Sequence, residues 1–185
     1  MSSIPEPTQQ EKFMKWYINL LKDAVSKNEL LKINSNYIFN ICGSYCRGKK
    51  DCGDIDVLIT INDPTYDNIN HCLHGYINIL TDKGILIDHL TEKGDKKYMG
   101  FCKLNGIVRR IDIRYIDYQS YYPALIYFTG SKEFNIKVRN KALEKGYSLS
   151  EYGLKEKSSG KLITLDSEEE LFKLLNIPYQ LPIDR

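Results

Sequence analysis

Long hydrophobic runs, Cys-x-x-Cys pairs and a secretory leader are all missing from this sequence. Without a long apolar run, we expect no transmembrane helix and no membrane partner. The first residues contain no basic segment followed by an apolar one, so we expect no secretory signal. The five cysteines are odd in number and form no metal-binding spacing. They argue against a zinc site and predict reduced thiols in an intracellular, reducing compartment.

The sequence also lacks a large excess of charge of one sign, since its formal net charge is only +2. Any argument for a nucleic-acid partner must therefore rest on the local distribution of charge. At 185 residues the chain fits one domain or two small ones with a real core. An aromatic, polar junction from residue 118 onward predicts a subdomain boundary there. Apolar periodicity predicts helices over residues 5–27, 65–80, 121–128, 132–144 and from Ser167, and strands over 37–42, 54–61, 85–90, 97–104, 107–116, 147–149 and 162–164.

Residues 42–59 form the stretch around which the chain is organised. The Gly43-Ser44 turn follows an apolar strand and brings backbone amides together, an arrangement that suits a phosphate. Asp54 and Asp56 share one face of the next strand, because side chains alternate along a strand. Paired carboxylates suit Mg²⁺, which shares its other positions with water and phosphate oxygens. The layout predicts a metal–nucleoside triphosphate site; the alternative is a surface turn followed by a strand with exposed Asp at its end.

A second polar face is expected on the strand over residues 107–116. By alternation, one face of that strand carries Arg110, Asp112 and Arg114. One interpretation is an exposed salt-bridge ladder that adds little stability. The other is that Asp112 joins Asp54 and Asp56, since three carboxylates on neighbouring strands hold two Mg²⁺ about 3.5–4 Å apart. The excess of Lys and Arg over residues 93–114 would suit a phosphate backbone.

The predicted helical pair in the C-terminal part also carries candidate binding residues. Tyr127 and Phe128 end the first helix, where an aromatic edge would face a base or a sugar. Asn135 and Arg139 lie four residues apart and therefore on one face of the next helix. The simpler interpretation is a small helical hairpin with the Asn and Arg exposed.

Together these residues resemble the family X DNA polymerases, of the DNA polymerase beta type. Residues 43–59 are similar to the Gly-Ser…Asp-x-Asp pattern of nucleotidyltransferases, and residues 109–114 and 127–152 narrow the resemblance to family X. The resemblance implies an α+β fold with two parts. Residues 1–117 would form a nucleotidyltransferase palm, a mixed or antiparallel sheet with helices on one face. Residues 118–185 would form a small C-terminal α/β subdomain, the thumb, that selects the nucleotide.

The resemblance also implies roles for individual residues. Asp54, Asp56 and Asp112 would be catalytic and would bind two Mg²⁺ ions, with Mn²⁺ as a substitute, and Asp112 would lie nearest the primer 3′-hydroxyl. Tyr127 and Phe128 would lie beside the incoming nucleotide, where the backbone of Tyr127 discourages a ribose 2′-hydroxyl. Nucleotide contacts are expected from Gly43, Ser44, Arg47, Gly53, Tyr127, Phe128, Gly130 and Asn135. DNA contacts are expected from Arg110, Arg114 and Arg139.

The sequence departs from the family pattern at several positions. Cys46 stands where the family often has Arg, Lys132 where DNA polymerase beta has Asp, and Glu6 where an N-terminal Arg would contact the triphosphate. These changes alter charge near the nucleotide and bear on affinity and fidelity. Ser131, in place of Trp, resembles the template-directed members. The family's lyase and helix-hairpin-helix domains are expected to be absent, as in minimal two-subdomain viral polymerases, which would place the protein in the host cytoplasm or the virion.

From these observations we expect a template-directed DNA polymerase that fills short gaps, as in base excision repair. Its substrates would be dNTP and gapped or primer–template DNA, and a DNA ligase would be a partner. Two rival hypotheses remain. One is a template-independent or small-acceptor nucleotidyltransferase, and the other is a non-catalytic DNA-binding relic of the same fold.

Overall fold

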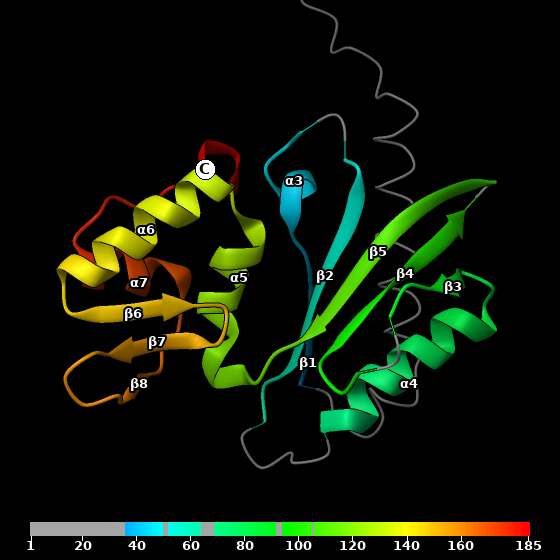
Figure 1. The fold of residues 1–185 in the computed structure, drawn as a ribbon, viewed down its shortest axis with the longest axis horizontal. Helices are drawn as coiled ribbons and strands as arrows, with labels where there is room; N and C mark the ends of the chain where they lie inside the picture. The colour runs from blue at the N-terminus through cyan, green and yellow to red at the C-terminus, as the bar shows by residue number, and fades with distance from the viewer. Residues whose placement is uncertain (1–35, 50–51, 64–68, 92–93, 105) are drawn as a thin grey trace, which may run out of the picture.

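The protein folds into two subdomains, each with its own sheet and hydrophobic core. The computed structural model describes residues 36–49, 52–63, 69–91, 94–104 and 106–185. Figure 1 shows the two subdomains side by side, with helix α5 (Tyr121–Thr129) between their sheets. No helix within these described ranges is long and apolar enough to cross a membrane.

The N-terminal subdomain is built on a mixed five-stranded sheet in the order β1-β2-β5-β4-β3. Strands β2 and β5 run parallel, and every other neighbouring pair is antiparallel. A single helical turn, α3 (Gly43–Cys46), joins β1 to β2, and α4 (Ile69–Asp82) follows β2. The strands are β1 (Tyr37–Ile41), β2 (Asp54–Ile61), β3 (Leu86–His89), β4 (Lys97–Leu104) and β5 (Ile107–Tyr115).

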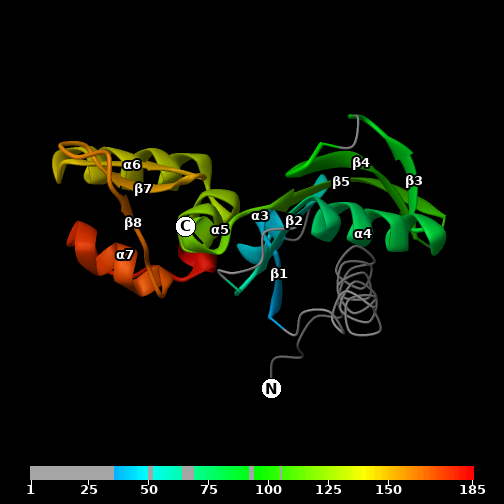
Figure 2. The same cartoon turned by 90° about the horizontal axis from the view of Figure 1, so that it is seen from below.

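Alternating side chains give this sheet one apolar face and one polar face. The apolar face packs against α4, and Figure 2 shows that helix lying against the sheet. Its buried strand residues include Ile55, Val57, Ile111, Ile113 and Tyr115. The polar face carries Asp54 and Asp56 of β2 with Arg110, Asp112 and Arg114 of β5, because these residues alternate with the buried ones along each strand. The hydrophobic core therefore anchors β2 and β5 and presents their acids on the other side.

The C-terminal subdomain packs three helices around a small antiparallel sheet in the order β6-β7-β8. Its core is formed by Ile126 of α5 with apolar residues from α6, α7 and the sheet, such as Phe134, Leu154 and Phe172. Serine side chains cap both later helices, since Ser131 accepts from a backbone N–H of α6 and Ser167 from one of α7. The elements are α6 (Lys132–Glu144), β6 (Tyr147–Ser150), β7 (Gly153–Glu156), β8 (Leu162–Ile163) and α7 (Glu168–Leu175).

Two short 3₁₀ turns complete the fold, η1 (Tyr118–Ser120) before α5 and η2 (Pro182–Asp184) after α7. Arg185 follows η2, and its side chain is completely buried. It makes two hydrogen bonds to the Glu168 carboxylate, at 2.8 and 3.0 Å. Its guanidinium also lies over the rings of Phe134 and Phe172. This paired and stacked arginine ties residues 177–185 to the first turn of α7.

The expected α+β fold class is confirmed as a mixed five-stranded sheet with helices and a small C-terminal α/β subdomain. The expected strand 54–61 and helix 132–144 have the predicted bounds. A further strand, β7 over residues 153–156, is not among the strands predicted from the sequence; it pairs with β6 on one side and β8 on the other. The helix expected over residues 5–27, including Glu6, and the start of the helix expected over 65–80 lie outside the described residues.

Candidate active site

The three candidate carboxylates lie together on the polar face of the larger sheet. Asp54 and Asp56 come from β2 and Asp112 comes from the neighbouring parallel strand β5. The register pairs Asp56 with Asp112 and Asp54 with Arg110. Two adjacent strands that are far apart in sequence therefore place three acids and one arginine in two neighbouring cross-strand pairs on the same face of the sheet.

Arg110 is the counter-charge that the chain itself supplies to these acids. Its Nη2 donates to Asp54 Oδ2, and its Nε lies 3.7 Å from Asp112 Oδ1. The Arg110 side chain is 45% exposed, whereas that of Asp112 is only 16% exposed. The arginine therefore reaches over the acids from the solvent side and contacts two of the three.

The acids remain short of positive charge despite this arginine. Burial, and next the neighbouring Asp54 and Asp112, raise the pKa of Asp56 from 3.8 to about 6. Burial also raises the pKa of Asp112, against the opposing effect of Arg110. Asp112 Oδ1 is buried, and no hydrogen bond reaches it from the residues that the structure describes.

The three carboxylates are candidate ligands for a divalent cation. Among the described residues, no three His, Cys, Asp or Glu side chains are already gathered as a metal cluster. Two of the three acids are instead held by contacts with Arg110. The donor set is entirely carboxylate oxygen, which Mg²⁺ prefers, and one buried oxygen accepts no hydrogen bond from any residue that the structure describes. The residues therefore fit a divalent cation.

The raised pKa of Asp56 makes the stability of the metal-free protein depend on pH. A folded-state pKa of about 6, above the ordinary 3.8, favours the protonated folded form. This contribution is complete below pH 3.8 and is lost as the pH rises through about 6. We expect the unfolding free energy, measured with urea in a chelator, to fall by about 1 kcal/mol through this group between pH 5 and pH 7.5. Asp56→Asn should remove that part of the fall, and an unchanged pH dependence in this variant would count against the assignment.

The Gly43-Ser44 turn, which precedes β2, packs directly against Asp56. Gly43 has a φ of +67°, in the left-handed region that favours glycine. A Cβ at this position would overlap Asp56 Oδ2. The backbone N–H of Cys42 also donates to the Asp56 carbonyl, at 2.9 Å. The Gly43-Ser44 turn therefore lies directly against Asp56.

Arg47 connects this turn to the C-terminal subdomain. Its Nη1 donates to the carbonyl of Thr129, the last residue of α5. The same nitrogen lies close to Gly130, where a Cβ would approach it to 3.0 Å. The Gly130–Ser131 peptide bond is cis. Arg47 and Gly130 are thus brought together, whereas Gly53 is exposed and has open space around its Cα.

The remaining candidate residues meet where α5 ends and α6 begins. Asn135 Nδ2 donates to the Tyr127 carbonyl at 2.7 Å. The guanidinium of Arg139 lies over the Tyr127 ring, 4.9 Å from its centroid, and that of Arg114 lies 5.2 Å from the centroid of the Phe128 ring. Asn135 and Arg139 thus join α6 to α5, and Arg114 joins β5 to α5, so the two subdomains present one connected surface.

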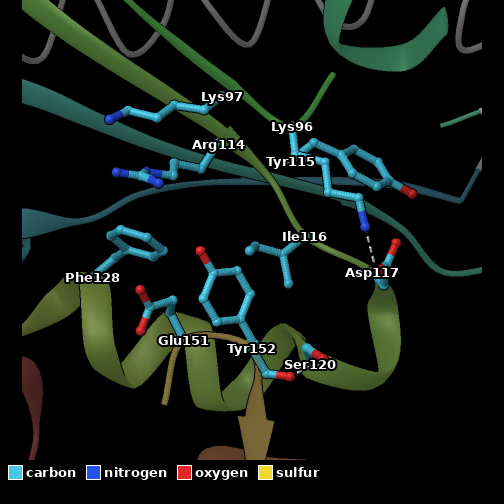
Figure 3. A pocket seen from close by; sticks show the side chains of 10 residues that line it. All are labelled: Lys96, Lys97, Arg114, Tyr115, Ile116, Asp117, Ser120, Phe128, Glu151 and Tyr152. Carbon is cyan, nitrogen blue, oxygen red and sulfur yellow. Dashed lines mark hydrogen bonds and ion pairs between the residues drawn. The ribbon is translucent and has the colours of Figure 1, made fainter. Parts of the chain in front are cut away.

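A cavity of about 250 Å³ opens between the subdomains beside Arg114. Figure 3 shows Arg114 and Lys97 on the sheet side, with Phe128, Glu151 and Tyr152 opposite. Glu151 is engaged by Arg139, whose Nη2 lies 3.4 Å from its carboxylate. Sequence reasoning did not single out Lys97 as a site residue, although its position opposite Arg114 follows from pairing the predicted hairpin strands.

Cys42 and Cys46, beside the site, form no disulfide. Burial raises the pKa of both Cys42 and Cys46. Because the thiolate is the reactive form, this environment disfavours cysteine chemistry at neutral pH. Cys42 packs in the hydrophobic cluster beside the turn.

Comparisons with known proteins agree with this geometry. Residues 17–118 match the DNA polymerase beta palm, and residues 124–185 match the DNA polymerase beta thumb. The chain is 37% identical over 161 residues to DNA polymerase lambda from Rattus norvegicus, covering 78% of this chain and 28% of that protein. It is 30% identical over 167 residues to DNA polymerase lambda from Arabidopsis thaliana, covering 78% of this chain and 31% of the relative.

A third relative is named for a different activity. DNA nucleotidylexotransferase from Xenopus laevis is 26% identical over 200 aligned residues, covering 88% of this chain and 39% of the relative. The chain thus spans between 28 and 39% of the length of these three curated relatives.

Proposed function

The chain belongs to the family X DNA polymerases, with a palm and a thumb of the DNA polymerase beta type, and we propose that it is a template-directed gap-filling polymerase. The reaction would transfer a deoxynucleotide from dNTP to a primer 3′-hydroxyl and release pyrophosphate. The observation that carries this proposal is the patch of Asp54, Asp56 and Asp112 on adjacent strands, short of positive charge and open to a divalent cation.

The three carboxylates would hold two Mg²⁺ ions, with Mn²⁺ as a substitute. Bound there, the ions would activate the attacking oxygen and stabilise the charge that develops on the leaving phosphate. Asp112 would lie nearest the primer 3′-hydroxyl. Arg110 would exchange its contacts with Asp54 and Asp112 for the primer terminus, because its guanidinium is already half exposed.

The turn beside Asp56 would hold the triphosphate. The amides of the Gly43-Ser44 turn suit phosphate oxygens, and Gly53 would add a contact from the open end of β2. Arg47 combines a place in this turn with a hydrogen bond to the end of α5. It would therefore couple triphosphate binding to the position of the helices that carry Tyr127 and Asn135, an arrangement that orients reacting groups.

The junction of α5 and α6 would select the nucleotide and read the template. Tyr127 and Phe128 would lie against the incoming sugar, and Asn135 would reach the minor-groove edge of the base. Asn135 already fixes the Tyr127 carbonyl, the backbone group that would oppose a ribose 2′-hydroxyl. Arg139 would exchange Glu151 for the template strand, and Arg114 would support the DNA side of the cavity.

Sugar discrimination should depend on the two aromatic residues. Replacing both Tyr127 and Phe128 with Ala is expected to lower the preference for dNTP over rNTP by about tenfold or more, because the wall beside the sugar is lost. The measurement is the ratio of kcat/KM for dGTP and GTP opposite a template cytosine. An unchanged ratio in the double variant would contradict this role.

Extension of a labelled primer on a one-nucleotide gap, with Mg²⁺ and all four dNTPs, tests the polymerase proposal. We expect addition of a nucleotide with release of pyrophosphate. No addition to any DNA primer would overturn the proposal in favour of a small-acceptor transferase or a DNA-binding relic. Similarity to a DNA nucleotidylexotransferase makes template-independent addition the second candidate, although Ser131 in place of Trp favours template direction.

Three further features of the proposed polymerase are its subdomain bounds, its DNA substrate and its role in repair. We propose that the palm covers residues 1–117 and the thumb residues 118–185, and that the substrate is gapped or primer–template DNA. A repair role such as base excision repair, with a DNA ligase acting on the filled gap, would follow from this substrate. The minimal viral type expected from the sequence stays a prediction.

A further inference from the structure

Strand β4 presents its own row of residues beside the three carboxylates. Burial alternates along β4, with Tyr98, Gly100 and Cys102 buried on the side of α4. The intervening residues therefore point to the polar face of the sheet. The antiparallel register places Met99 opposite Asp112 and Phe101 opposite Arg110.

Combining the two registers gives three rows across β2, β5 and β4. One row is Asp56–Asp112–Met99 and the next is Asp54–Arg110–Phe101. The row on the other side of the acids ends in Arg114 and Lys97. The carboxylate patch thus continues, without a break in the sheet, into two apolar side chains.

Met99 and Phe101 contribute to no hydrophobic core among the described residues. Both side chains are half-buried, on the face opposite the core. Two cationic residues of the same strand, Lys97 and Lys103, lie on either side of them on this face. An apolar pair between cations on an open sheet face matches a nucleic-acid strand, which offers sugars and bases between phosphates.

We propose that Met99 and Phe101, the apolar shelf, bind the sugar and base edges of the last nucleotides of the primer strand. The inference rests on the proposed function, in which Asp112 lies nearest the primer 3′-hydroxyl. Met99 is the cross-strand neighbour of Asp112, so the terminal nucleotide would lie over it. The strand then leaves the carboxylates across Phe101, where Arg110 and Lys103 would meet its phosphates.

Equilibrium binding without catalysis tests the shelf. Fluorescence anisotropy would measure the Kd of the full chain for a primer–template whose primer ends in a dideoxynucleotide, and for the single-stranded template alone. Phe101→Ala is expected to weaken primer–template binding about tenfold, the range seen when an aromatic nucleic-acid contact is removed. Met99→Ala should give a smaller loss in the same direction. Leu143→Ala removes an exposed apolar side chain on α6, away from the larger sheet, and serves as the control with no expected change.

The outcomes separate the shelf from the polymerase proposal. A loss for primer–template that is absent for single-stranded template supports the shelf. Unchanged binding in both variants, or an equal loss on the two DNAs, would overturn it. Melting temperatures check folding, and Phe101→Leu, which keeps an apolar surface, should retain most of the affinity. If the wild-type protein binds primer–template through the shelf but extends no primer, the polymerase proposal fails and the shelf stands.

Discussion

Asp112→Ala is expected to abolish primer extension while leaving the protein folded. Asp112 on β5 is paired across the strands with Asp56 on β2, beside Asp54. Its buried Oδ1 has no hydrogen-bond donor among the described residues. If it holds a catalytic ion, its removal should lower kcat by at least about a thousandfold, equivalent to ~4 kcal/mol of transition-state stabilisation. The folded state should not suffer, because a carboxylate with a raised pKa is removed from a site rich in negative charge.

The control for this variant is Asp88→Ala, which removes an exposed acid from strand β3 of the same sheet. Single-turnover extension and urea unfolding, measured on both variants, separate catalysis from stability. Near-normal extension by Asp112→Ala would remove this residue from the catalytic role. Loss of both activity and folding would assign it a structural role instead.

Gly43→Ala is expected to lower activity about a hundredfold, the effect of displacing a reacting group by about 1 Å. The new methyl group would overlap Asp56 Oδ2, so that carboxylate or the turn itself would have to move. The substitution also places a side chain at a φ of +67°, which costs about 1–2 kcal/mol of stability.

Gly84 offers a matched control for this backbone cost. It has the same φ of +67°, and nothing lies within 4 Å of a Cβ at that position. Gly84→Ala should lose similar stability and keep its activity. Equal activity in the two glycine variants would show that close contact between the turn and Asp56 is not needed for catalysis.

Much of the fold follows from local patterns in the sequence. Alternation of apolar and polar residues predicts the faces of β2 and β5, because a buried face demands a period of two. The serine before Glu168 predicts the start of α7, since its side chain caps the first turn. The same alternation also places Asp54 and Asp56 on one face and Asp112 on the matching face of its own strand.

Other features depend on partners far away in the chain. β7 was missed because its four residues carry no clear alternation, and pairing with β6 and β8 decides their conformation. The hydrogen bond from Arg47 to the Thr129 carbonyl joins residues 82 positions apart and leaves no mark in the local sequence. The contact of Arg110 with Asp54 is likewise set by the register of two strands.

The most direct test of the central claim is incorporation of each single dNTP on a one-nucleotide gap carrying each of the four template bases. A primer without template runs alongside, and Mg²⁺ is present throughout. We predict that the template base decides which nucleotide is added, and that the primer alone is extended poorly or not at all. Addition that ignores the template base, with equal extension of the primer alone, would contradict template direction and make the protein a terminal transferase.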